Sequence, residues 1–176
     1  MYDWPEVRSA TNKLWQSIAM AFTRHGVPVP TALDRSIPVE KAWRSPNLLL
    51  AQTCGLPYVR YLRDTVRILG VMAYDLSGCR TGEYHSVLVV HQAAAISELK
   101  ACRGVRVAIN SDDSYSGCLA LDRTVATFFE GTFFGERIPT GSHRESIRAV
   151  ARGIADIAAI DCVAWALALK HEPATE

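Results

Sequence analysis

The chain has 176 residues, which is enough for one large domain or two small ones. Hydrophobic residues make up 49% of it, so a core can be buried, and a net charge of +1 with scattered basic residues argues against a nucleic-acid partner. No apolar run reaches the roughly 18–20 residues of a membrane span, and the opening MYDWPEVRSA lacks the composition of a secretory signal.

Helical and strand patterns alternate along the chain. Residues 3–26 predict a long helix that begins near Asp3 and ends at Gly26. Six short apolar runs then predict strands, at residues 47–52, 66–72, 85–92, 105–110, 136–141 and 154–161. Helical patterns lie between them, at residues 54–64, 97–104, 142–153, from Ser114 and from Cys162. Strands that alternate with helices favour an α/β fold with a mainly parallel sheet.

Cysteines can form disulfides or bind metal ions, and the chain has an odd number of them. The five are Cys54, Cys79, Cys102, Cys118 and Cys162. Their irregular spacing fits neither a disulfide framework nor a zinc site. We therefore expect reduced, mostly buried thiols, no metal and no cofactor.

Small polar residues follow several of the predicted strands. Ligands of open α/β sheets bind outside the carboxyl ends of the strands. The residues found at those ends are Gln52, Thr53 and Cys54, the serines of SYSG, Gly141, Ser142 and His143, and Asp161. These strand ends are therefore the candidate ligand site.

The sequence SYSG resembles an anion-binding helix start. The first turn of a helix leaves backbone N–H groups without intrahelical partners, and these bind anions. Ser114 and Ser116 add hydroxyl groups, and Gly117 permits close approach of the backbone. The alternative is structural: serine and aspartate are common helix caps, so Ser114 and Asp161 would be caps. His143 fits both interpretations.

Several motifs, in order, resemble the phosphate/phosphonate-type solute-binding proteins of ABC transporters. They are LLLAQTCGLPYV, CRTGEYHSVLVV, VRVAINSDDSYSG and TGSHRESIRAVARGIADIAAIDCVAW. The resemblance implies the type II periplasmic-binding fold, in which two α/β lobes joined by a hinge hold the ligand in a cleft. Lobe one would be residues 1–86 and incomplete. Lobe two would be residues 87–176 and would begin with the crossing strand.

The resemblance also implies which residues contact the ligand. In this family the serine-rich helix start binds the phosphonate. The other ligand-binding positions are assigned from the motifs that match. The implied ligand-binding residues are Tyr2, Gln52, Thr53, Tyr84, Ser114, Tyr115, Ser116, His143 and Asp161.

The function expected from this resemblance is capture of a small oxyanion such as phosphate or a phosphonate in the interlobe cleft, for uptake through an ABC permease. The protein would not be an enzyme. The alternative is a cytoplasmic small-molecule sensor or an enzyme that uses the same cleft, with His143 beside Ser114 or Cys54. No G-x-S-x-G elbow supports catalysis.

Location and assembly depend on the chain ends. The family implies a periplasmic protein, whereas the sequence as given, if complete, implies a cytoplasmic one. A lobe one that lacks strands would expose a sheet edge, through which a homodimer could form.

Overall fold

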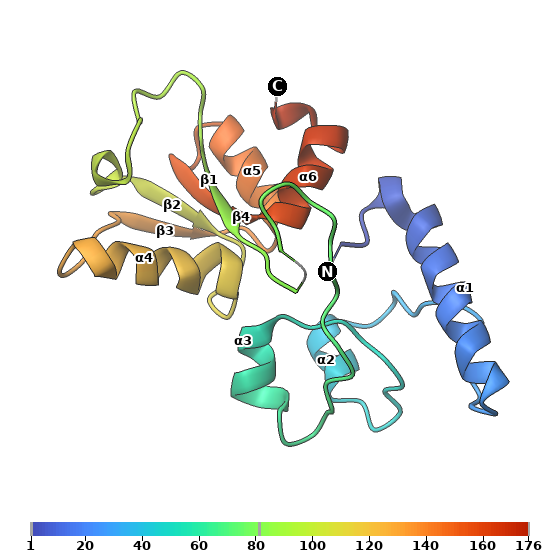
Figure 1. Ribbon diagram of the computed structural model, residues 1–176. Helices are drawn as coiled ribbons and strands as arrows, with labels where there is room; N and C mark the ends of the chain where they lie inside the picture. The colour runs from blue at the N-terminus through green and yellow to red at the C-terminus, as the bar shows by residue number, and fades with distance from the viewer. Residues whose placement is uncertain (1, 81, 176) are drawn as a thin grey trace. The chain divides into compact units, whose positions relative to one another are not determined.

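The computed structural model describes residues 2–80 and 82–175. The chain divides into two compact units, drawn in Figure 1. The first contains the described residues up to Thr53 together with Tyr58–Arg67, and the second contains Cys54–Pro57 together with the described residues from Ile68 onward. The boundary between lobes near residue 86, which the resemblance implied, stays a prediction.

The first unit contains a 3-10 turn at Pro5–Val7, helix α1 at Arg8–Arg24, helix α2 at Val39–Trp43 and a π-helical turn at Tyr58–Leu62. The long helix predicted over residues 3–26 is therefore present. Asp3 does not cap it, because the Asp3 carboxylate accepts hydrogen bonds from Thr11 and Arg35 instead. Trp15 of α1 is buried, and its ring N–H donates to the Pro30 carbonyl at 3.2 Å.

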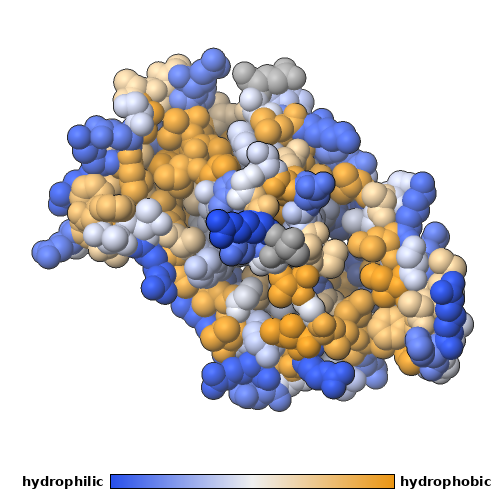
Figure 2. All heavy atoms as spheres, in the orientation of Figure 1, coloured by the Kyte–Doolittle hydropathy of each residue, from blue (hydrophilic) through white to orange (hydrophobic). Residues whose placement is uncertain are grey.

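The strand predictions for residues 47–52 and 66–72 are wrong. Both runs are irregular, and no described residue before Ser86 belongs to a strand. A strand needs a neighbour to take up its backbone hydrogen bonds, and neither run has one. Apolar side chains of the second run stay exposed, with Val71 75% accessible, and Figure 2 shows apolar residues reaching the surface on the face it draws. A homodimer through a sheet edge of lobe one stays a prediction.

The second unit is built on a four-stranded mixed sheet. Its strands are β1 (Ser86–Val90), β2 (Arg106–Ile109), β3 (Glu136–Pro139) and β4 (Ile157–Asp161), in the spatial order β1-β4-β2-β3. Strand β2 is parallel to β3 and β4, whereas β1 is antiparallel to β4. The last four predicted strands and the α/β class are thus confirmed.

Helices cover both faces of this sheet (Figure 1). They are a π-helical turn at Tyr115–Leu119 that continues into α4 (Ala120–Phe128), α5 (His143–Ala151) and α6 (Cys162–His171). The second unit also contains α3 (Gly55–Pro57) and 3-10 turns at Leu99–Cys102 and Pro173–Thr175. Side chains alternate between the faces of a strand. Val107 and Ile157 accordingly pack with Leu121 and Val125 of α4, while α5 and α6 lie against the opposite face.

Strand β4 is the centre of this core, because all five of its residues are buried. The last residue of this strand, Asp161, therefore lies in the interior of the second unit. Within the described parts of the chain, no helix has both the length and the apolar character needed to cross a membrane.

Candidate functional site

The candidate residues fall into the two units. Tyr84, Ser114, Tyr115, Ser116, His143 and Asp161 belong to the second unit, so their geometry can be compared directly. Tyr2, Gln52 and Thr53 belong to the first unit. That these three residues act on the same ligand as the other six stays a prediction.

The serine-rich stretch after β2 starts a helix as expected. Ser114 is the N-cap, and its Oγ accepts the N–H of Gly117 at 3.1 Å. The first turn is a wide π-helical one, in which the Leu119 N–H donates to the Ser114 carbonyl. Ser116 therefore lies inside the first turn, where its hydroxyl is not needed for capping.

Ser116, His143 and Asp161 form one buried chain of polar groups. Ser116 Oγ lies 3.0 Å from His143 Nε2, and the same nitrogen lies 3.0 Å from Asp161 Oδ2. Ser116 is 5% accessible and Asp161 is 1% accessible. These three residues, distant in sequence, meet because each lies at or beyond the carboxyl end of a strand in the parallel part of the sheet.

Three helix starts meet at this chain of polar groups. Ser116 lies in the turn that begins α4, His143 is the first residue of α5, and Asp161 is the N-cap of α6. Asp161 Oδ1 accepts the N–H groups of Val163 and Ala164 at 3.0 and 2.8 Å. Because a helix N-terminus carries a partial positive charge, three of them together favour a negatively charged group.

Gly117 allows the helix start to pack closely against its neighbours. A Cβ atom at this position would lie 1.9 Å from Asn110 Oδ1 and 2.8 Å from His143 Cε1. Any residue with a Cβ atom would fit here only if both Asn110 and His143 moved. The backbone at SYSG is thereby held directly against Asn110 and His143.

Two polar atoms at this place have no partner within the described protein. Asn110 Oδ1 and His143 Nδ1 are buried and make no hydrogen bond. Leaving a buried polar atom unpaired costs about 1–3 kcal/mol, so such atoms are rare and call for a water or a ligand. Asn110 was not among the predicted residues. Its position at the end of a buried strand was the signal that could have identified it.

Tyr84 and Tyr115 lie beside a hollow of about 350 Å³. The hollow is bounded by β1 and α4, through residues such as Leu88 and Thr124. Ser86 also lines it and donates from its hydroxyl to the Ser116 carbonyl at 2.9 Å, which connects the hollow to the helix start. Ser116 and His143 themselves do not line the hollow.

Tyr84, one of the two tyrosines at this hollow, keeps its proton and remains a hydrogen-bond donor. Burial raises the pKa of Tyr84 to about 12, and the nearby groups of Cys54 and Asp161 act in the same direction. Burial also raises the pKa of the Cys54 thiol, and the charge of Asp161 adds to this effect. Both groups are therefore neutral at physiological pH, and Cys54 is a poor nucleophile.

A family model described as ABC transporter, phosphonate, periplasmic substrate-binding protein matches residues 26–175. The chain belongs to this family, whose members are the periplasmic substrate-binding proteins of phosphonate transporters. A search of curated proteins found no match.

Two solved structures are similar to parts of the chain. One is PhnD1 from Prochlorococcus marinus (MIT 9301) in complex with methylphosphonate, with 28% identity, a TM-score of 0.45 and coverage of 52% of this chain and 37% of that one. The other is XAC2383 from Xanthomonas citri bound to chloride ion, with 22% identity, a TM-score of 0.42 and coverage of 51% and 37%. The chain thus spans well under half the length of either protein.

Proposed function

We propose that the chain is part of a solute-binding protein that captures a small phosphorus oxyanion, a phosphonate or phosphate, at the three helix starts of the second unit. Membership of the phosphonate-binding family supports this function. The observation that carries it is the buried chain Ser116–His143–Asp161, beside which Asn110 Oδ1 and His143 Nδ1 lack protein partners.

The available groups suit an oxyanion that still carries one proton. Backbone N–H groups of the first helical turn and the Ser116 hydroxyl can donate to its oxygens. Asn110 Oδ1 accepts, so it pairs with a ligand O–H. A singly protonated phosphonate or phosphate offers such an O–H, whereas sulfate at neutral pH does not. We therefore expect phosphorus oxyanions to bind more tightly than sulfate.

Asp161 acts through His143 rather than on the ligand. One of its oxygens caps α6 and the other lies on His143 Nε2. With its proton on Nε2, the ring donates to Asp161 and presents Nδ1 as an acceptor, while in the charged imidazolium Nδ1 becomes a donor. Asp161 is thus a positioning residue that fixes the orientation of the ring.

The same geometry supports binding without catalysis. A Ser-His-Asp triad uses both ring nitrogens, one for the serine and the other for the aspartate. Ser116 and Asp161 both contact Nε2, so a proton held on this nitrogen for Asp161 leaves it unable to accept the proton of Ser116. We propose that the protein is not an enzyme, and that it works in the periplasm with an ABC permease, as its family does.

The test is calorimetric titration of the chain with methylphosphonate, inorganic phosphate and sulfate. A hydrogen bond to a charged group contributes about 1.5–3 kcal/mol, so Ser116→Ala should lose roughly tenfold to hundredfold in affinity. Ser111→Ala is the matched control, because its hydroxyl contacts Asp113 on the same loop and not His143. Equal affinities for the wild type and Ser116→Ala would refute the proposed site.

A further inference from the structure

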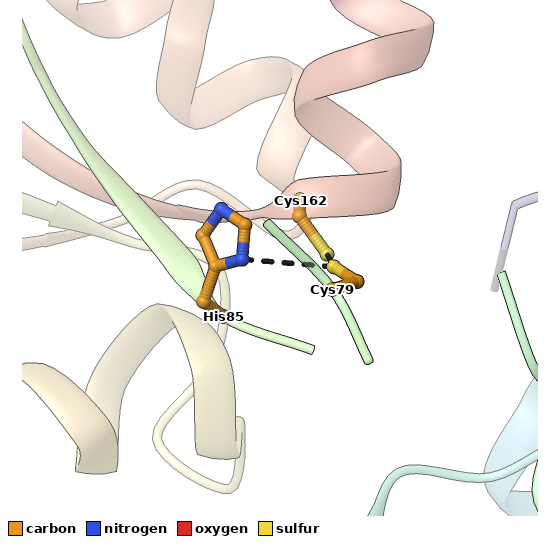
Figure 3. A group of neighbouring side chains, drawn as sticks. All are labelled: Cys79, His85 and Cys162. Carbon is orange, nitrogen blue, oxygen red and sulfur yellow. Dashed lines mark hydrogen bonds between the residues drawn. The ribbon is translucent and has the colours of Figure 1, made fainter. Parts of the chain in front are cut away.

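Cys79, His85 and Cys162 come together at a second place in the same unit, drawn in Figure 3. The Sγ atoms of Cys79 and Cys162 are 3.2 Å apart, and Cys79 Sγ lies 3.6 Å from His85 Nδ1. The two cysteines are 83 positions apart in the sequence. Neither residue is part of the proposed ligand site.

The sheet holds these side chains in position. Ser86 and Asp161 face each other across β1 and β4, and the Cys162 N–H donates to the His85 carbonyl at 2.9 Å, which continues this pairing. Gly78, with a φ of 80°, makes the turn that precedes Cys79 and packs against the His85 ring. The approach of the two sulfurs therefore follows from a hydrogen-bonded framework.

We infer that Cys79 and Cys162 are a redox pair, which closes into an intramolecular disulfide when the protein meets a disulfide oxidant such as glutathione disulfide. In the first step the Cys79 thiolate attacks the oxidant, forms a mixed disulfide and releases one glutathione thiolate. In the second step the Cys162 thiolate attacks the Cys79 sulfur and releases the second glutathione. Two protein thiols are oxidised and one glutathione disulfide is reduced to two thiols, so atoms and electrons balance.

The environment assigns the order of attack. Cys79 is half-buried and so reaches the oxidant, and the adjacent His85 ring nitrogen can accept its proton. Cys162 is buried, and this burial, together with the contact with Cys79, raises the pKa of its thiol. Cys162 is thus the resolving thiol, which reacts only after Cys79 has formed the mixed disulfide.

A metal ion is the competing occupant, and the geometry favours the disulfide. Tetrahedral zinc with Zn–S bonds of about 2.3 Å separates two sulfurs by about 3.8 Å. The observed 3.2 Å is shorter, and only three ligand side chains meet at this place among the described residues. Contact between the sulfurs is what disulfide formation needs, since each step is attack of one sulfur on another.

The disulfide would join the segment before β1 to the first residue of α6, directly after Asp161. Disulfides persist in oxidising compartments, which include the bacterial periplasm. The sequence predicted reduced thiols because cysteines 83 positions apart form no recognisable motif. Only the pairing of β1 with β4 brings them together.

The experiment uses the full chain, equilibrated in glutathione buffers from fully reducing to fully oxidising, with free thiols alkylated and peptides identified by mass spectrometry. The expected product is one cross-link between the Cys79 and Cys162 peptides, with a loss of the mass of two hydrogen atoms. The closed loop is long, so the thermal midpoint of the oxidised form should rise by roughly 5–15 °C. Cys79→Ser should lose both effects, and Cys54→Ser is the matched control that should keep them.

Two results would overturn the inference. In the first, both thiols remain open to alkylation in every buffer, or Cys162 cross-links to a cysteine other than Cys79. In the second, the wild-type chain dialysed with zinc retains one equivalent, and a chelator must remove it before Cys79 and Cys162 can be alkylated. The second result would assign the three side chains to a metal site.

Discussion

At the scale of single residues, Gly117 is the most sensitive position of the candidate site. A methyl group there would overlap Asn110 Oδ1 and press on His143. We expect Gly117→Ala to lower the free energy of unfolding by about 1–3 kcal/mol, as overpacking of a tight interior does. Because Asn110 and His143 must shift, methylphosphonate binding should fall as well. Chemical denaturation and calorimetry measure the two effects.

Gly70→Ala is the control for this substitution. A Cβ atom at Gly70 would meet no other atom within 4 Å. Its effect on stability should stay within about 0.5 kcal/mol, as for other surface substitutions. If both variants unfold at the same denaturant concentration, the close packing at Gly117 does not hold the helix start.

The residues of the site were predictable where strand ends and helix starts could be recognised. The cap role of Ser114, with Ser116 inside the first turn, follows from the spacing in SYSG and is confirmed. The bond between Ser116 and His143 could not be predicted, because it depends on the register between β2 and β3. Asn110 was missed although its place directly after a buried strand was a usable signal, whereas the packing of Gly117 against it could be found only in the structure.

At the scale of elements, Glu172 fastens the end of α6 to α5. Its Oε2 accepts from Arg144 Nε at 2.6 Å and from Arg148 Nε at 3.0 Å. Burial disfavours the charged carboxylate, but the hydrogen bonds from the two guanidinium groups outweigh it and hold the pKa of Glu172 below its usual 4.5. The end of α6 is thus joined to the first half of α5, close to His143.

Glu172→Gln should therefore destabilise the protein in a pH-dependent way. A carboxyl group with a lowered pKa stabilises the folded state above its ordinary pKa, and this contribution is lost as the pH falls through the folded value. We expect the variant to be about 1–3 kcal/mol less stable at pH 7. The difference should shrink as the pH falls below about 4.5. Denaturation at a series of pH values measures this.

Glu145→Gln is the matched control, because the exposed Glu145 pairs with the same Arg148 at 2.7 Å. An exposed ion pair contributes little, so the loss should be below about 1 kcal/mol. If Glu145→Gln destabilises as much as Glu172→Gln, or if neither effect depends on pH, the stabilising role of Glu172 between α5 and α6 is refuted.

The elements themselves were predicted unevenly. The runs that became β1, β2, β3 and β4 have partners on the sheet, and their patterns predicted them correctly. Residues 47–52 and 66–72 show the same apolar character, yet neither forms a strand. The sequence pattern indicates which residues of a segment are apolar. It does not indicate whether a neighbouring strand is present to pair with the backbone hydrogen-bonding groups of that segment.

At the scale of the whole molecule, stability should be concentrated in the sheet of the second unit. Val107, Ala108 and Ala158 of β2 and β4 are completely buried, whereas residues 66–72 are irregular and mostly exposed. Backbone amides of the two strands should exchange with solvent only through global unfolding. Those of residues 66–72 should exchange rapidly.

Hydrogen exchange followed by mass spectrometry tests this distribution. Peptides from β2 and β4 should remain protonated longest, and peptides covering residues 66–72 should be deuterated first. Equal protection of both regions would show that residues 66–72 share the cooperative core of the sheet.

In the proposed function, the helix starts of the second unit bind a phosphorus oxyanion. The most direct measurement is nuclear magnetic resonance of the ¹⁵N-labelled full chain during titration with methylphosphonate. The largest shifts should occur at the backbone amides of Tyr115, Ser116 and Gly117 and at the ring nitrogens of His143, and they should saturate together. The claim is contradicted if these signals stay in place while the ligand moves others, or if a folded chain shows no saturable shift at all.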